Sequence, residues 1–580
     1  MFSLRNTFMT VYKGRLYPNY WDMIALCLAL SVISLLAWNA KQMAVPYHLG
    51  QLSSISLEPS ALLGYSLRTV LRMLLAMLLS LLFTFVFATW AAKSKSAGRI
   101  IIPIIDVLQS VPILGFLSIT VVGFIELFPN SMLGPESAAI FAIFTSQAWN
   151  MALGFYQTVR SVPAELKEAA DMFHLSAWQR FWRIDVPFSM PGLLWNMMMS
   201  MSAGWFFVVA SEAISVSNQQ ILLPGIGSYI AVAINSANVP AIWYAILAML
   251  VVILLYDQLL FRPLIAWADK FKAEQVAQER EVHSWVVNML HRTRMLRFLG
   301  NKMSRLFDTF VNAKIFLSKP ESYTEIARKL RYEKWVGWML TAIFFIVLIA
   351  AILFLGNYIF RMVPFSEFTK VLGLGLITAT RVFVVVILCT LIWVPIGVWV
   401  GLRPSVAEFV QPTAQFLAAF PAYLLYPLFV VVIIKYHMNI EIWVTLLMFL
   451  GAQWYVLFNV IAGASVIPKD LLQAADNFGV SSWLRWRRLL LPAVFPYYIT
   501  GAITAVGGAW NASIVAEVVR WGDKKLVATG LGAYITENSD ASNFMHVALG
   551  VGMMCILVLV LNRLIWRPLY VLAEEQYQLE

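Results

Sequence analysis

Long apolar runs, each bounded by charged or turn-forming residues, recur from one end of the chain to the other. Runs of about 18 residues or more have the length that an α-helix needs to cross the roughly 30 Å hydrocarbon core of a bilayer. These runs predict about twelve membrane helices and therefore an all-α polytopic membrane protein. The expected spans are residues 21–38, 61–92, 100–128, 136–160, 188–214, 240–261, 335–359, 372–401, 405–434, 440–465, 496–519 and 545–566.

The composition agrees with this pattern and excludes a soluble protein. Of the 580 residues, 60% are hydrophobic and 13% are charged, whereas soluble domains carry about 25% charged residues. The net charge of +11 is explained by basic residues in alternate, cytoplasmic loops, so we expect no nucleic-acid partner. Cys27, Cys389 and Cys555 lie in separate apolar runs, and their spacing predicts no metal site.

One short polar segment occurs twice and relates the two halves of the chain. Residues 163–187 and 468–492 align without a gap at an offset of 305, and 11 of their 25 positions are identical. The same offset matches Trp205 with Trp510. Each half holds six expected spans and begins on the same side of the membrane. The repeat is therefore parallel, with a pseudo-twofold axis along the membrane normal.

We accordingly expect a first half at residues 1–262, a linker at 263–333 and a second half at 334–580. An Arg-Pro pair, at residues 262–263 and again at 567–568, is expected to end the last span of each half. The linker is basic, which indicates a cytoplasmic location. Its mixture of aromatic, aliphatic and basic residues is equally typical of a helix lying on anionic lipid and of a solvated connector.

The repeated segment predicts a compact helix–turn–helix on the cytoplasmic face. Ser176 and Gln179 have the spacing of a capping box, which would start a second short helix. Gly479 marks the turn in the second copy, where a positive φ is expected. His174 occupies that position in the first copy, where a side chain is less easily accommodated. Pro187 is expected to end the second helix before the next span.

The segment resembles the EAA loop of ABC-importer permeases, whose consensus is E-A-A, three residues, Gly, nine residues and Ile-x-Leu-Pro. The first copy has His where the consensus has Gly, and the second has Gln where it has Glu. The tails 203–230 and 508–535 further resemble the nitrate/taurine/sulfonate/bicarbonate-type permeases. The positions matching the loop are Glu168, Ala169, Ala170, Asp171 and His174 in the first copy, and Gln473, Ala474, Ala475, Asp476 and Gly479 in the second.

This resemblance implies a type I importer permease in a bacterial inner membrane, with both termini in the cytoplasm. Each loop would dock one of two copies of an ABC ATPase subunit, and an extracytoplasmic binding protein would deliver the substrate. No G-x-x-x-x-G-K-[ST] motif occurs in the chain. We therefore expect no enzyme activity and no cofactor in the chain itself, with ATP and Mg bound by the partner subunits.

Four charged residues fall within the predicted spans at matching positions of the two halves. Arg72 matches Arg381 at an offset of 309, and Glu212 matches Glu517 at 305. Counted along their helices, all four lie about 30 Å from the cytoplasmic end, near the outer boundary. A charge there is costly unless it is paired or faces water. The sequence leaves open a structural Arg–Glu pair in each half, or an outer gate whose vestibule attracts an anion.

Three further residues are candidates for the substrate pathway. Asp106 lies in an apolar stretch, where it either lines the pathway or hydrogen-bonds between helices. Trp205 and Trp510 either contact the solute or pack in the core. The resemblance allows nitrate, sulfonates, bicarbonate, aromatic acids or vitamin precursors, and the two arginines favour an anion. The alternative function is a secondary transporter with a parallel repeat, which would not explain two EAA-type loops.

Overall fold

The structure is a computed structural model, and it describes most of the two predicted halves. The described residues are 55–216, 219–268, 293–313 and 363–576, with scattered positions within 23–43, at 286 and within 339–357. The expected spans 21–38 and 335–359 lie largely outside them. The chain divides into two compact units, each described by itself. The smaller unit comprises Met1–Trp38, Val162–Leu194 and Tyr256–Pro320, and the larger one Asn39–Ser161, Trp195–Leu255 and Glu321–Glu580.

The all-α polytopic fold is confirmed. Among the described residues, eight helices are long and apolar enough to cross a membrane, and a bent pair raises the number to nine. The eight helices are Pro59–Lys93, Leu133–Arg160, Ala177–Glu212, Val239–Ala268, Phe365–Gly401, Ile440–Ser465, Ser482–Ala516 and Phe544–Ala573. The bent pair is Pro404–Ala419 with Ala422–Lys435.

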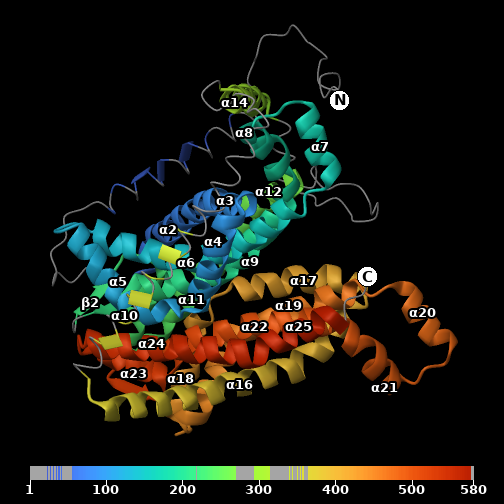
Figure 1. Cartoon of the computed structure of the whole chain (residues 1–580). Helices are drawn as coiled ribbons and strands as arrows, with labels where there is room; N and C mark the ends of the chain where they lie inside the picture. Colours follow the sequence, from blue (N-terminus) through green and yellow to red (C-terminus); the bar gives the residue numbers. More distant parts are fainter. Residues whose placement is uncertain are drawn as a thin grey trace. The chain divides into compact units, whose positions relative to one another are not determined.

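The order of elements in the first half returns in the second half (Figure 1). The first half contains α2 (Leu62–Phe83), α3 (Thr89–Lys93), α4 (Lys95–Ser110), α5 (Ile113–Leu127), α6 (Leu133–Arg160), α7 (Ala164–Met172), α8 (Ala177–Arg180), α9 (Val186–Glu212), β1 (Ala213–Val216), β2 (Gln219–Leu222), α10 (Ile226–Asn235), α11 (Val239–Tyr256) and α12 (Arg262–Ala268). The second half contains α16 (Phe365–Gly401), α17 (Pro404–Ala419), α18 (Tyr426–Lys435), α19 (Ile440–Ser465), α20 (Lys469–Asn477), α21 (Ser482–Arg485), α22 (Leu491–Ala516), β3 (Val518–Trp521), β4 (Lys524–Val527), α23 (Leu531–Asp540), α24 (Phe544–Leu561) and α25 (Arg567–Gln576). The linker contributes α14 (Arg294–Val311).

The expected spans 100–128 and 405–434 are each broken into two helices. Each breaks just before a proline, at Pro112 and at Pro421, and the second pair bends by 73°. The residue preceding each proline, Val111 or Phe420, has an extended backbone. Proline disfavours helical geometry in the residue before it, because its ring collides with that residue's backbone.

The prediction that Arg-Pro pairs and Pro187 end helices is also wrong. The candidate spans run through these prolines, as Ala177–Glu212 and Val239–Ala268 illustrate. A π-helical turn precedes the proline in each case, and its extra residue moves the carbonyl that the ring would strike in an α-helix. The four turns are Phe181–Asp185, Asp257–Phe261, Trp486–Leu490 and Asn562–Trp566.

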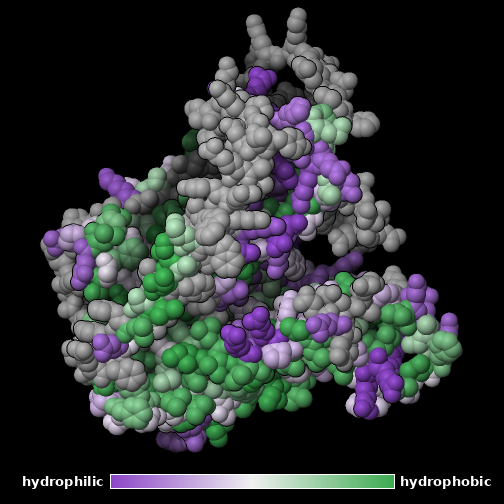
Figure 2. All heavy atoms as spheres, viewed as in Figure 1, coloured by the Kyte–Doolittle hydropathy of each residue, from purple (hydrophilic) through white to green (hydrophobic). Residues whose placement is uncertain are grey.

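Close helix packing forms the core of the larger unit, where α19 packs against both α16 and α22. Glycines permit this approach, since a Cβ at Gly397 would lie 2.7 Å from Val460 and one at Gly501 would lie 2.8 Å from the Tyr455 carbonyl. Small residues have this role at membrane helix interfaces. Figure 2 shows hydrophobic side chains gathered over α16 and α24, the surface expected to face lipid.

Candidate functional site

Two short β-hairpins, which the sequence analysis missed, follow α9 and α22. Strand β1 pairs antiparallel with β2, and β3 pairs with β4. Each hairpin returns the chain to a short helix, α10 or α23, whose N-cap is Gly225 or Gly530. The G-x-G sequences of the two tails therefore lie beside the last residues of α9 and α22.

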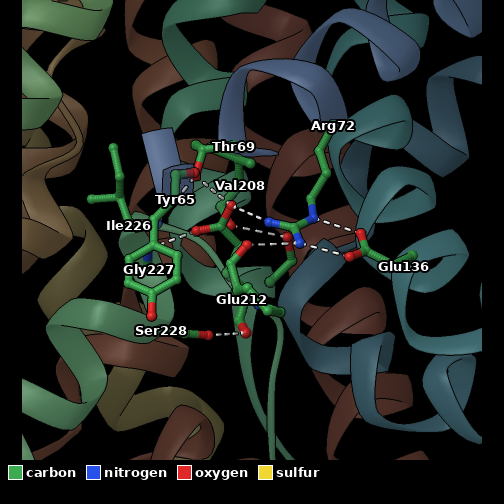
Figure 3. Close-up of polar contacts among 11 residues, drawn as sticks. Tyr65, Thr69, Arg72, Glu136, Val208, Glu212, Ile226, Gly227 and Ser228 are labelled. Carbon is green, nitrogen blue, oxygen red and sulfur yellow. Dashed lines mark hydrogen bonds and ion pairs between the residues drawn. The ribbon is translucent and has the colours of Figure 1, made fainter. Parts of the chain in front are cut away.

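A buried ion-pair network joins four elements at this end of the first half (Figure 3). Arg72 on α2 binds Glu136 on α6 with two hydrogen bonds, Nε to Oε2 at 2.6 Å and Nη2 to Oε1 at 2.7 Å. Its Nη1 donates to Glu212 Oε1 at 2.6 Å, and Nη2 also donates to the carbonyl of Pro224 at 3.1 Å. The guanidinium is completely buried. The predicted pair of Arg72 with Glu212 is thus present, with a second carboxylate added.

The Glu212 carboxylate also holds the N-terminus of α10 in place. Thr69 Oγ1 donates to Glu212 Oε1 at 2.7 Å and the Gly227 N–H donates to Oε2 at 2.6 Å. The first N–H groups of a helix attract a negative charge, so this position suits a carboxylate. Any Cβ on Gly225 would lie 2.3 Å from the carboxylate carbon. Glycine is required at this position because the helix and the carboxylate approach so closely.

The second half repeats the network, but its second carboxylate is bound differently: Arg381 makes one bond to Glu441, whose other oxygen accepts from Thr529. Arg381 Nη1 donates to Glu517 Oε1 at 3.1 Å, and its Nη2 pairs with Glu441. Thr378 donates to Glu517 at 2.8 Å, and the N–H of Ala533 donates to it at 3.0 Å. The Glu441 side chain is 40% exposed, whereas that of Glu136, its counterpart, is 3% exposed.

Sequence reasoning missed Glu136 and Glu441 as partners of the arginines. The repeat itself contained the information, because these two residues match at the same offset of 305 that relates the two loops. Both lie near the start of a predicted span, a position at which a charged residue does not by itself indicate a buried partner. A charged residue repeated at a span boundary is thus a candidate partner for a repeated charge inside another span.

The networks are built to hold helices together. Removing one partner from a buried ion pair costs about 3–5 kcal/mol because the other charge remains buried. Each guanidinium faces two carboxylates, so neither Arg72 nor Arg381 presents an unbalanced positive charge. These arginines therefore do not favour an anionic substrate.

A cavity of about 240 Å³ lies between the two halves within the larger unit. The first half contributes residues from α5, the end of α9 and α10, and the second half contributes residues from α18, β3 and α23. The halves also meet through hydrogen bonds, from the Gly522 N–H to the Ile234 carbonyl at 2.9 Å and from the Ile113 N–H to Asn511 Oδ1 at 2.9 Å. The cavity thus lies where a pathway shared by both halves would pass.

The other predicted pathway residues do not line this cavity. Trp205 and Trp510 are fully buried at equivalent places on α9 and α22, and Trp510 belongs to the hydrophobic core. Asp106 is exposed on α4. Their surroundings are those of packing and surface residues.

Both repeated loops form the predicted helix–turn–helix. In the first, α7 and α8 are joined through His174, whose φ is 50°. The predicted capping box is confirmed, because Ser176 accepts from the Gln179 N–H at 3.2 Å and Gln179 Oε1 accepts from the Ser176 N–H at 3.0 Å. In the second loop, α20 and α21 begin and end at positions offset by 305, and Gly479 has a φ of 60°.

The loops carry exposed apolar side chains although they are polar overall. In the first loop Met172 and Phe173 are exposed, and in the second loop Phe478 and Trp483 are exposed, Phe478 by 84%. Ala170 is buried, whereas Ala475 is half-buried. Exposed aromatic residues on an otherwise polar loop are typical of a surface that binds another protein.

Linker helix α14 packs on the first loop. Trp178 contacts Phe310 with ring centroids 5.2 Å apart, and Trp182 contacts Phe307 at 5.4 Å. Asn312, just after α14, accepts hydrogen bonds from Gln179 at 3.1 Å and from Arg183 at 3.0 Å. Trp483, the counterpart of Trp178, is 72% exposed. This segment of the linker is therefore a helix docked on protein.

Comparison with known proteins places both halves in one family. Residues 84–261 and again 393–565 match the family described as "Binding-protein-dependent transport system inner membrane component". The two matches cover corresponding parts of the two halves and include both repeated loops.

Several curated permeases are similar to parts of the chain. The bicarbonate transport system permease protein CmpB of Synechocystis sp. is 26% identical over 176 residues, which are 30% of this chain and 60% of the relative. The nitrate import permease protein NrtB of Leptolyngbya laminosa is 24% identical over 185 residues, 32% of this chain and 63% of the relative. The taurine transport system permease protein TauC of Escherichia coli is 26% identical over 183 residues, with the same coverages. The chain thus spans less than two thirds of the length of these relatives.

Proposed function

Because the chain belongs to the family of binding-protein-dependent transport system inner membrane components, we propose that it is the whole permease of an ATP-driven importer. Two family matches within one chain support a fused permease, in which both halves of the pathway are supplied together. A substrate-binding protein would deliver the solute, and separate ATPase subunits would bind ATP and Mg and hydrolyse the ATP. The membrane would be a bacterial inner membrane, with both termini in the cytoplasm.

The two helix–turn–helix loops are the proposed docking points, one for each of two ATPase subunits. The observation that carries this proposal is the exposure of aromatic side chains at equivalent positions, Phe173 in the first loop and Phe478 in the second. Aromatic side chains that fill pockets on a partner commonly dominate the energy of an interface. The matching EAA-type positions, from Glu168 to His174 and from Gln473 to Gly479, would surround these side chains at the interface.

The solute would pass between the halves, through the cavity lined by α5, α9, α10, α18, β3 and α23. The networks centred on Arg72 and Arg381 lie at the same ends of α9 and α22, which we assign to the outer side of the membrane. They would hold each hairpin and short helix against the spans. Their role would be to keep the outer end of each half rigid while the halves move relative to one another.

The proposal is tested by purifying the full chain from its native membrane and measuring the ATPase activity that accompanies it. The double variant Phe173→Ser/Phe478→Ser should lose at least tenfold of this activity, because a truncated interface anchor costs about 2 kcal/mol or more. The matched control is Phe365→Ser, since Phe365 is also exposed but lies at the start of α16, outside both loops. Undiminished ATPase association, or uptake driven by an ion gradient without an ATPase, would overturn the proposal.

A further inference from the structure

The two halves line their shared cavity with different chemistry. At an offset of 309, Leu114 and Leu117 in the first half correspond to Tyr423 and Tyr426 in the second. The two tyrosine rings contact each other edge to face, with centroids 5.9 Å apart. The first half therefore presents aliphatic side chains where the second half presents phenols.

The same difference continues along the short helices α10 and α23. Ala231 and Ile234 correspond to Thr536 and Ser539 at the offset of 305, and all four line the cavity. The wall from the first half is consequently mostly apolar, although Asn235 also lines it, and the wall from the second half carries hydroxyl groups. Two identical subunits could not produce this difference at a symmetric interface, because each wall would repeat the other. Fusion of the halves allows it.

One ion pair gives the polar wall a positive and a negative group whose charges cancel. Arg520 Nη2 on β3 pairs with Asp540 Oδ2 on α23 at 2.5 Å, and both residues line the cavity. Among the described lining residues they are the two charged ones. Both side chains are partly exposed, by 38% and 19%, so each keeps atoms that a solute can reach. The corresponding positions of the first half are Ser215 and Asn235.

We infer that this cavity is the solute-binding site of the permease and that it takes a small amphiphilic organic solute without net charge. The inference rests on the proposed transport function and adds the class of solute. The apolar wall would cover the solute's hydrocarbon face. Tyr423 and the Arg520–Asp540 pair would bind a polar or zwitterionic end. The Tyr426 and Thr536 hydroxyls donate to the carbonyls of Leu447 and Ile514, so they would offer the solute their acceptor lone pairs.

The size of the cavity supports an organic solute. A cavity of about 150 Å³ accommodates benzene, so 240 Å³ accommodates a molecule of about ten non-hydrogen atoms. Nitrate and bicarbonate have fewer than half as many atoms. Either ion would leave most of the apolar wall without contacts. Binding would then lack the free energy of apolar burial, which is about 25 cal/mol per Å² of surface.

The charge balance supports a solute without net charge. An anion would compete with Asp540 for Arg520 and leave a partly buried carboxylate without its partner, which is unfavourable. A zwitterion can bind both members of the pair at once, with its acidic group at Arg520 and its ammonium at Asp540. A neutral polar group can hydrogen-bond to either member without separating them.

The test measures the thermal unfolding midpoint of the purified full chain with probes of matched ionic strength. The uncharged or zwitterionic amphiphiles are phenylalanine, leucine and benzyl alcohol, and the anions are benzoate, nitrate and bicarbonate. We expect at least one of the first three to raise the midpoint by about 2–4 °C at saturation, the shift that about 1 kcal/mol produces in a large domain. The three anions should produce no comparable shift.

Two variants test whether the probe binds in this cavity. Each replaces residues of the second half with their counterparts from the first half. Thr536→Ala/Ser539→Ile copies the apolar wall, and Arg520→Ser/Asp540→Asn copies the uncharged positions, so both use side chains that the same fold already accommodates. Each should abolish the shift while leaving the midpoint without probe within about 2 °C of the parent. Ala237→Ser copies the equivalent Ser542, which also has a positive φ, at a residue that does not line the cavity, and it should retain the shift.

A shift produced by nitrate or bicarbonate alone, by none of the six probes, or equally in the parent and in the variants would overturn the inference. The ATPase activity of the same preparations separates this result from the proposed transport function. A preparation that carries its ATPase but responds only to the anions refutes the class of solute alone. A preparation without any ATPase refutes the transport proposal as well.

Discussion

The carboxylate of Glu136 is 3% exposed and that of Glu441, its counterpart in the other half, is 40% exposed, although each binds the equivalent arginine. The two repeated loops differ in the same way, because Trp178 packs against α14 while Trp483 is exposed to solvent. The repeat preserves the backbone and the pairing of each arginine with two glutamates, while the number of bonds to the second glutamate and its exposure to water differ. Equivalent ion pairs should therefore have unequal energies in the two halves.

The largest expected difference concerns the two arginines. Arg72→Met should destabilise the protein by about 3–5 kcal/mol, because it leaves Glu136 and Glu212 buried without their counter-charge. Arg381→Met should cost less than half as much, because water can solvate Glu441. Denaturant unfolding of the purified variants measures both. Equal losses would show that exposure of Glu441 does not weaken the second network.

The glycines that face the buried carboxylates should instead behave alike. A Cβ at Gly225 or at Gly530 would lie 2.3 Å from atoms of Glu212 or Glu517. Either Gly→Ala change should therefore cost about 1–3 kcal/mol, the usual cost of overpacking. Gly507→Ala in α22 is the control, since nothing lies within 4 Å of its Cβ position. A large difference between Gly225 and Gly530 would mean that one network is looser than its geometry indicates.

A bulky residue in the loop helices should destabilise the two loops unequally. Ala170 is buried and Ala475 is half-buried, so Ala170→Leu should loosen its loop by about 1–2 kcal/mol and Ala475→Leu by less. Limited proteolysis of the full chain measures the opening of each loop. The result also bears on ATPase docking, where we predict unequal losses of association from the two substitutions. Identical losses in both measurements would remove the asymmetry.

The turn residues should show a smaller effect, and here the second loop should be the more sensitive one. Gly479 has a φ of 60°, where a side chain costs about 1–2 kcal/mol, so Gly479→Ala should destabilise the second loop by about 1 kcal/mol. His174→Gly should change the first loop by less, because relief of strain at φ 50° is offset by greater freedom of the unfolded chain. Hydrogen exchange in α8 and α21 measures both. Destabilisation by His174→Gly as large as that by Gly479→Ala would indicate that His174 has contacts of its own.

The smallest effect is expected where the linker docks. Asn312→Ala removes two partly exposed hydrogen bonds, to Gln179 and Arg183, and should weaken the docking of α14 by about 0.5–1.5 kcal/mol. Proteolysis within α14 should become faster while the second loop is unaffected. Thr309→Ala, exposed on the same helix, is the control. An equal change at the second loop would mean that the substitution acts through global stability.

The sequence alone determined the features that depend on neighbours along the chain. Apolar run lengths defined the spans, the offset of 305 defined the halves, and the Ser176–Gln179 spacing correctly predicted a cap whose atoms lie three residues apart. Counting residues along helices placed Arg72 and Glu212 at one height, and their pairing followed because a buried charge needs a partner. These inferences use helix geometry, which is the same in every helix.

Only the tertiary structure decided which elements lie side by side and how much water they exclude. Residues 64 positions apart, Arg72 and Glu136, meet because α2 packs on α6, and no local period encodes that contact. The cavity likewise depends on both halves, because its apolar and polar walls come from distant segments that are equivalent in the repeat. The proline positions were visible in the sequence, yet their effect depended on the turn before them: Pro421 breaks a helix, whereas Pro187 follows a π turn and does not. Burial and packing depend on many contacts between residues that are distant in the sequence. The repeat therefore predicted the symmetry of the two halves, and only the folded structure shows at which residues the halves differ.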